Sequence, residues 1–195
     1  MTDTGAWTTF GERPAYESPW VTVTLADVQA PNGARFEHHV IRLPPVAIAL
    51  LVNDDEEALM LWRHRFVTGQ WGYELLGGLV EPGEDPAQAA AREAREESGW
   101  QPLGEPDHLA TFEPLPGQVA SPVSAYLWRR ADHVGDPTDT EEAGRLDWVP
   151  LARAPDLMRR GQLLGSGTLV ALLAYLSGAT TQPRQNHDST GFRLP

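Results

Sequence analysis

Several residue types and patterns are missing from this chain. Cysteine is absent, which excludes disulfides, thiol nucleophiles and zinc–thiolate sites. The 15 basic residues are all arginine, because the chain has no lysine. No stretch approaches the roughly 18–20 consecutive apolar residues of a membrane span, and residues 1–10 lack the basic start and apolar run of a signal peptide. We therefore expect a cytoplasmic protein.

The charge balance limits the possible partners. A formal net charge of −12 argues against nucleic acid or an anionic membrane surface, because a long polyanion would be repelled. A small nucleotide can still bind through metal ions. At 195 residues and 21.4 kDa, the chain is long enough for one domain with terminal extensions and a sizeable core.

Residues 85–99 carry the signals of a short helix. Asp85 is a good N-cap, Pro86 suits the first helical position, and Gly99 suits a left-handed stop. These signals predict a helix from Pro86 to Ser98. Its alanines, at positions 87, 90, 91 and 94, have little bulk, so part of the helix is expected to lie close against a sheet.

This helix also carries a cluster of carboxylates. Glu93, Glu96 and Glu97 stand at i, i+3 and i+4, so their side chains share one side of the helix and repel one another by about 0.2–0.5 kcal/mol per pair. One interpretation is a solvated face in which Arg92 and Arg95 supply the compensating charge. The other is a site for a hard divalent cation, which prefers oxygen ligands.

The preceding segment favours the cation. Gly77, Gly78 and Gly83 predict a tight glycine-rich turn with uncovered backbone carbonyls and amides. Mg²⁺ takes such oxygens as ligands and keeps water and substrate phosphates in its other positions. The turn and the helix together indicate a metal–diphosphate site.

The spacing over residues 78–100 resembles the signature box of the Nudix hydrolases. Gly78, Glu84 and the run Arg-Glu-Ala-Arg-Glu-Glu-Ser-Gly-Trp at 92–100 fill every fixed position, while Ala94 and Trp100 stand at its two loosely aliphatic positions. The resemblance implies an α/β/α sandwich with a mixed sheet. It also implies a Mg²⁺- or Mn²⁺-dependent attack of water on the diphosphate of a nucleoside diphosphate linked to another group.

The same resemblance implies roles for residues of the box. Glu93 and Glu97 match metal ligands, Glu96 matches a third ligand or a residue that orients water, and the carbonyl of Gly77 matches a backbone ligand. Gly78 is a fixed structural glycine, and Glu84 and Arg92 match a structural ion pair that holds the loop against the helix.

Features outside the box resemble the ADP-ribose pyrophosphatase branch. Pro116 lies sixteen residues after Trp100, which is the mark of that branch, and a hairpin is expected over residues 20–43 around a Pro-Asn-Gly turn. In that branch an N-terminal sheet is exchanged across a homodimer and contacts the base. Trp20 is thus a candidate for base stacking, the alternative being a core or dimer-interface aromatic.

Three further residues are candidates through the same branch. Arg65 matches an arginine of the phosphate or terminal-ribose pocket, the alternative being a surface cation. Glu74 matches a glutamate that orients loop or substrate, the alternative being a merely exposed side chain. Glu142 matches a loop acid that acts as catalytic base or as partner of a metal-bound water, the alternative being a solvated loop. Many relatives have an acidic residue soon after the Pro-Gly pair, and this chain has none between Gln118 and Ser124.

The remaining chain completes the expected fold. We divide it into an N-terminal, dimer-forming extension (1–43), a Nudix domain (44–178) and a polar tail (179–195). Residues 7–19 look irregular because of Pro14 and Pro19, and residues 131–142 look like a polar loop. Strands are expected at 46–52, 58–62, 71–76, 109–114, 124–129 and 145–149, and helices at 155–160 and 168–177.

The resulting expectation is a metal-dependent pyrophosphohydrolase that converts ADP-ribose to AMP and ribose 5-phosphate. A nucleotide sugar such as GDP-mannose is the nearest alternative substrate, because the box contacts only the diphosphate. A non-catalytic Nudix sensor is the alternative from another class. An isoprenoid-diphosphate isomerase of the same fold is disfavoured because the expected cysteine is absent.

Overall fold

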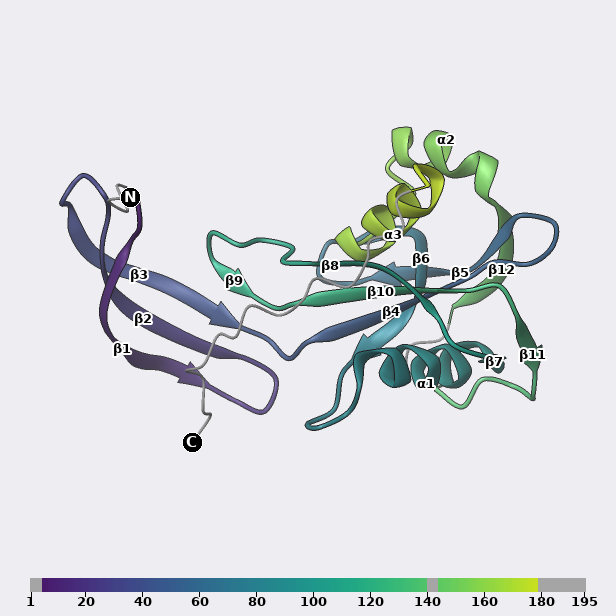
Figure 1. The fold of residues 1–195 in the computed structure, drawn as a ribbon, viewed down its shortest axis with the longest axis horizontal. Helices are drawn as coiled ribbons and strands as arrows, with labels where there is room; N and C mark the ends of the chain where they lie inside the picture. The colour runs from purple at the N-terminus through teal and green to yellow at the C-terminus, as the bar shows by residue number, and fades with distance from the viewer. Residues whose placement is uncertain (1–4, 140–143, 179–195) are drawn as a thin grey trace.

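The computed structural model of the chain describes residues 5–139 and 144–178. Its body is a six-stranded mixed sheet of order β12-β5-β6-β4-β10-β8, in which β4 and β10 are parallel. Helix α1 covers one face and α2 and α3 cover the other (Figure 1), which confirms the α/β/α sandwich. The elements are β4 (Val46–Leu51), β5 (Glu57–Arg65), β6 (Gln70–Leu79), α1 (Pro86–Ser98), β8 (Asp107–Phe112), β10 (Val123–Trp128), β12 (Arg145–Pro150), the 3₁₀ turn η1 (Leu151–Arg153), α2 (Ala154–Arg159) and α3 (Ser166–Leu176).

Helix α1 has the predicted limits for the predicted reasons. The Asp85 side chain accepts hydrogen bonds from the amides of Ala87 and Gln88, and Gly99 adopts φ 73° at the stop. Ala90 and Ala94 are 0% exposed and pack on the sheet. Because alanine is so small, the helix axis lies close to the sheet and its carboxylates are brought against strand β6.

A second, four-stranded sheet precedes the body and lies beside it at the left of Figure 1. It consists of β1 (Thr8–Glu17), β2 (Thr22–Gln29), β3 (Arg35–Arg42) and the short β9 (Val119–Ala120). The predicted hairpin is thus present as β2–β3. The prediction of an irregular segment at 7–19 was wrong: Pro14 is accommodated because β1 is an edge strand with a register shift after this residue.

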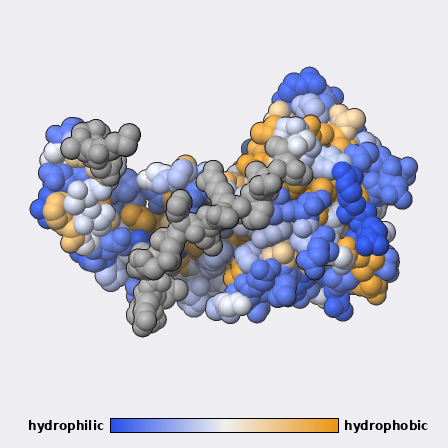
Figure 2. Space-filling model, viewed as in Figure 1, coloured by the Kyte–Doolittle hydropathy of each residue, from blue (hydrophilic) through white to orange (hydrophobic). Residues whose placement is uncertain are grey.

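Aromatic side chains remain exposed on this sheet. Phe10, Tyr16 and Trp20 are 50%, 58% and 71% exposed, and Figure 2 shows hydrophobic residues at the surface of the sheet among hydrophilic ones. No helix within the described ranges is both long and apolar enough to cross a membrane.

Two local predictions need correction. Gly77 and Gly78 do not form the predicted turn; they continue strand β6, opposite Ile48 and Ala47 of β4. The strand needs glycine at 77 because a Cβ there would lie 2.4 Å from the Ala47 carbonyl oxygen. The predicted loop at 131–142 begins with strand β11 (Ala131–His133), which pairs with β7 (Trp100–Pro102).

Candidate active site

Arg92 binds the partly buried carboxylates Glu93 and Glu96 of α1. Its Nε and Nη2 donate to the two oxygens of Glu84 at 3.0 and 3.1 Å, so the two side chains form a bidentate pair between loop and helix. Its Nη1 donates to Glu93 at 2.8 Å and to Glu96 at 3.0 Å. Two carboxylates of the helix therefore converge on one cationic nitrogen, which offsets their mutual repulsion.

Gly78 leaves the space that Glu93 occupies. A Cβ at this position would lie 2.4 Å from the carboxyl carbon of Glu93 and 2.6 Å from both of its oxygens. The Glu93 carboxylate is therefore packed directly on the backbone of β6. Any side chain at position 78 would displace the Glu93 carboxylate, so this steric conflict explains the glycine at this position.

Glu97 lies deeper than the other two carboxylates. Its side chain is 2% exposed, and its Oε2 accepts a hydrogen bond from the amide of Gly77 at 2.7 Å. Its Oε1 accepts from Nη1 of Arg63 at 2.8 Å. The carboxylate is thus fixed between the end of β6 and an arginine of β5.

Arg63 is the residue of this network to which sequence reasoning assigned no role. It is 5% exposed and its Nε also donates to Glu74 at 2.7 Å, so it joins Glu74 to Glu97. Arg65, 40% exposed, completes the chain of charges by binding Glu74. The alternation of side chains along β5 could have identified it. Arg63 follows Leu61 by two residues and Leu59 by four, so it lies on the same buried face of the strand.

Two carboxylates of this network have pKa values below their ordinary range. Burial raises the pKa of Glu74, but the hydrogen bonds and charges of Arg65 and Arg63 outweigh burial, and the net pKa is lowered. The pKa of Glu84 is lowered by hydrogen bonds from Arg92 and from the Glu81 amide. Both groups are ionised at neutral pH and hold their arginines in place.

The donor set fits a hard divalent cation. Glu93 and Glu96 already converge on a positive atom, and all the oxygens concerned are carboxylate or backbone oxygens, as Mg²⁺ or Mn²⁺ prefers. In the arrangement seen here, no three acidic or histidine side chains of the described residues meet at a common point. Glu97 accepts hydrogen bonds from Arg63 and from the Gly77 amide.

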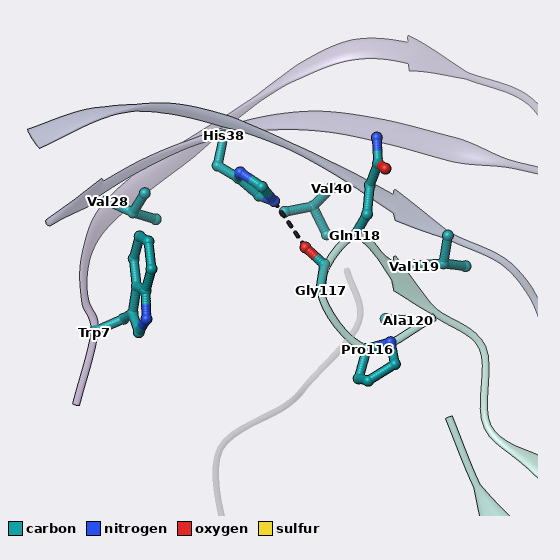
Figure 3. Close-up of a pocket in the computed structure, with 9 residues that line it drawn as sticks. All are labelled: Trp7, Val28, His38, Val40, Pro116, Gly117, Gln118, Val119 and Ala120. Atoms are coloured by element: carbon teal, nitrogen blue, oxygen red, sulfur yellow. Dashed lines mark hydrogen bonds between the residues drawn. The ribbon is translucent and has the colours of Figure 1, made fainter. Parts of the chain in front are cut away.

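Other predicted site residues lie elsewhere. Pro116 lines a cavity of about 400 Å³ between the N-terminal sheet and the segment before β9 (Figure 3). His38 fixes this segment, because its Nε2 donates to the Gly117 carbonyl at 2.9 Å, while Trp7 forms the opposite wall. Trp20 lies in the turn between β1 and β2 and does not contribute to this cavity.

Glu142 lies outside the described residues, but the structure describes the residues up to Asp139 and from Gly144. The amides of Thr138 and Asp139 donate to the Glu96 carbonyl at 2.9 and 3.0 Å. On the other side, a Cβ at Gly144 would lie 3.2 Å from Cβ of Arg63. The described residues on either side, Asp139 and Gly144, thus lie next to Glu96 and Arg63, two residues of the network.

Comparison with family models and with known proteins identifies relatives of this chain. Residues 42–164 match the NUDIX domain model, and residues 7–41 match the nucleoside diphosphate sugar hydrolase N-terminal domain model. The chain is 46% identical over 179 residues to the CMP-5'-(N-acetyl-N-hydroxy-3-aminopropyl)phosphonate hydrolase of Streptomyces rubellomurinus, covering 91% of this chain and 86% of the relative. It is 30% identical over 162 residues to the ADP-ribose pyrophosphatase of Mycobacterium tuberculosis, covering 80% and 78%.

A solved structure of an ADP compounds hydrolase superposes with a TM-score of 0.75 at 21% identity, covering 88% of this chain and 93% of that one. This likeness confirms the fold. The predicted resemblance to ADP-ribose pyrophosphatases is confirmed by the mycobacterial relative. Because the family model spans most of the chain and the relatives are hydrolases, this protein belongs to the Nudix hydrolase family and is a pyrophosphohydrolase.

Proposed function

We propose that this protein hydrolyses, with Mg²⁺ or Mn²⁺, the phosphoanhydride that joins a nucleoside monophosphate to a second phosphorus-bearing group. The observation that carries the proposal is the network that sets Glu93, Glu96 and Glu97 against strand β6. ADP-ribose is the first candidate substrate, with AMP and ribose 5-phosphate as products. It is supported by the branch-marking Pro116 and by the mycobacterial relative.

Glu93, Glu96, Glu97 and the carbonyl of Gly77 would hold the ion. When bound, the divalent ion neutralises the diphosphate and activates water. Arg63 keeps Glu97 oriented, and Glu74 holds Arg63 and Arg65 in place. The partly exposed Arg65 guanidinium contacts a substrate phosphate.

Glu142 is the proposed general base. The proposal is supported by the described residues on either side of it, because the Asp139 amide donates to the Glu96 carbonyl and Gly144 lies beside Arg63. A carboxylate between these points would take a proton from the attacking water once substrate is bound.

A CMP-linked phosphonate is the second candidate substrate. The relative that is 46% identical over 91% of this chain hydrolyses such a compound. The absence of an acidic residue between Gln118 and Ser124, where many ADP-ribose pyrophosphatases have one, also favours a different leaving group. Both candidates require the same attack on phosphorus and release a nucleoside monophosphate.

We also propose that the N-terminal sheet forms a homodimer and that the base binds near it. The exposed Phe10, Tyr16 and Trp20 would be covered by a second copy or by the base. The cavity beside Pro116 would take the part of the substrate away from the diphosphate. Light scattering at micromolar concentration tests the dimer, and a monomeric mass would refute it.

The test of function is a substrate panel with each metal. ADP-ribose, a CMP-linked aminopropylphosphonate, GDP-mannose and ATP are incubated with Mg²⁺ or Mn²⁺, and released nucleoside monophosphate is quantified by chromatography. We expect kcat/KM for the first or second compound to exceed that for ATP at least tenfold. Glu97→Gln should abolish turnover with an unchanged circular dichroism spectrum. Equal turnover of all four, or an active Glu97→Gln enzyme, would overturn the proposal.

A non-catalytic sensor is disfavoured by the same residues. A protein that only holds a nucleotide has no need to place three carboxylates on one helix at the electrostatic cost they carry. Saturable binding of ADP-ribose without release of AMP in the panel would identify such a sensor.

A further inference from the structure

A second cavity, which we call the tryptophan cavity, lies at the end of the body opposite the N-terminal sheet. It is lined by the carboxyl ends of β4 and β10, by the β7–β11 pair and by β12, and has a volume of about 440 Å³. Figure 1 shows β7 and β11 at the right, at this end. Its volume is typical of small-molecule sites, which span roughly 300–1,000 Å³. The carboxyl ends of neighbouring parallel strands are also a common location for ligand sites in α/β sheets.

Three of the seven tryptophans line this cavity. Trp100 and Trp148 meet edge to face, with ring centroids 5.3 Å apart. Trp128 is fixed because its indole N–H donates to the Gly104 carbonyl at 3.1 Å. Such walls suit a flat aromatic ring. Trp100 stands at a position of the Nudix box that is usually aliphatic, so this part of the wall differs from the family pattern.

The cavity is lined by both negatively and positively charged side chains. Among the described residues, the carboxylates of Asp54 and Asp132 have no hydrogen bond or ion pair, and the guanidinium of Arg130 has no ion pair. Arg130 lies beside Trp128, since a Cβ on Gly104 would be 3.3 Å from its Nη2. Arg129 also lines the cavity, but its guanidinium donates to Glu56 and Tyr175. Among the described lining residues, a ligand here would therefore meet hydrogen-bond acceptors and one cationic donor without an ion pair, around an aromatic wall.

We propose that the tryptophan cavity binds a nucleoside 5'-monophosphate whose base carries an exocyclic amino group. The base stacks on Trp100 and Trp148, since Trp128 is only 4% exposed. The amino group donates to an aspartate, and the phosphate binds Arg130. Uracil presents a carbonyl where cytosine presents the amino group, so it would face the carboxylates unfavourably.

This site is distinct from the proposed catalytic one. None of Glu93, Glu96, Glu97 or Gly77 lines the tryptophan cavity. Trp100 follows the end of α1 directly, and its amide is bound by the Ser98 side chain at 3.1 Å. The proposal does not rest on the proposed substrate, although the proposed reaction would release a ligand of this class.

The test is calorimetric titration with CMP, UMP and cytidine in the presence of EDTA. We expect CMP to bind saturably and UMP at least tenfold more weakly. Arg130→Gln should weaken CMP binding about fivefold or more and leave cytidine binding unchanged. The pair Asp54→Asn with Asp132→Asn should remove the preference for CMP over UMP. Glu93→Gln, at the catalytic site, should bind CMP as the wild type does.

A second measurement locates the ligand. In ¹H–¹⁵N spectra, CMP should shift the indole signals of Trp100 and Trp148 and leave that of Trp20 in place. Equal affinities for CMP and UMP, undetectable CMP binding, or a normal Kd in Arg130→Gln would overturn the proposal. So would loss of binding in Glu93→Gln, or indole shifts confined to the N-terminal sheet.

Discussion

Replacing Arg63 by methionine tests the buried charge network most directly. The change keeps most of the apolar stem but removes the guanidinium that joins Glu97 to Glu74, whose side chains are 2% and 11% exposed. Removing one partner of a buried ion pair costs about 3–5 kcal/mol. Glu97 keeps the Gly77 amide and Glu74 keeps Arg65, so we expect the lower end of that range.

A loss of about 3 kcal/mol corresponds to a fall in Tm of about 6–12 °C for a chain of this size. Urea unfolding followed by tryptophan fluorescence measures it, with the slope m unchanged if only the native state is affected. Arg13→Met is the matched control, because Arg13 binds Glu37 at 2.9 Å with both side chains at least half exposed. Solvent screens that pair, and its loss should barely move the midpoint. Equal midpoints for the two variants would refute the reasoning.

Three further predictions follow from other parts of the site. Gly78→Ala should abolish most turnover with little change in circular dichroism, because the new Cβ meets the carboxylate of Glu93. Gly11→Ala is the control: a Cβ there has no atom within 4 Å, so this variant should turn over normally. An active Gly78→Ala enzyme would contradict the packing of Glu93 on Gly78. Glu142→Gln should lower kcat by a factor of about 10²–10⁴, whereas Glu141→Gln should resemble the wild type. Similar rates for the two variants in stopped assays would count against Glu142 as the general base. The pKa of Glu74 is lowered in the folded state, so its stabilisation is present above the unfolded pKa of about 4.3 and is lost as pH falls through the folded value. Urea midpoints at pH 7, 5 and 3 should therefore fall more steeply for the wild type than for Glu74→Gln, and parallel curves would rule out this contribution.

The limits of α1 and of the hairpin could be predicted because local chemistry sets them. A side chain that caps its own helix, a glycine that stops it and a Pro-Asn-Gly turn act within a few residues. Strand β1 could not be predicted, because all ten of its residues are exposed and it has no alternating apolar face.

The sequence by itself determined that Glu93, Glu96 and Glu97 stand on one side of α1, because helical spacing alone puts them there. Only the tertiary structure decided what each of them touches. Glu97 meets Arg63 from 34 residues away, and Gly78 makes room for Glu93 across a strand–helix contact. Such contacts depend on how strands pair and how closely an alanine-rich helix approaches the sheet, and no local pattern in the chain records those distances.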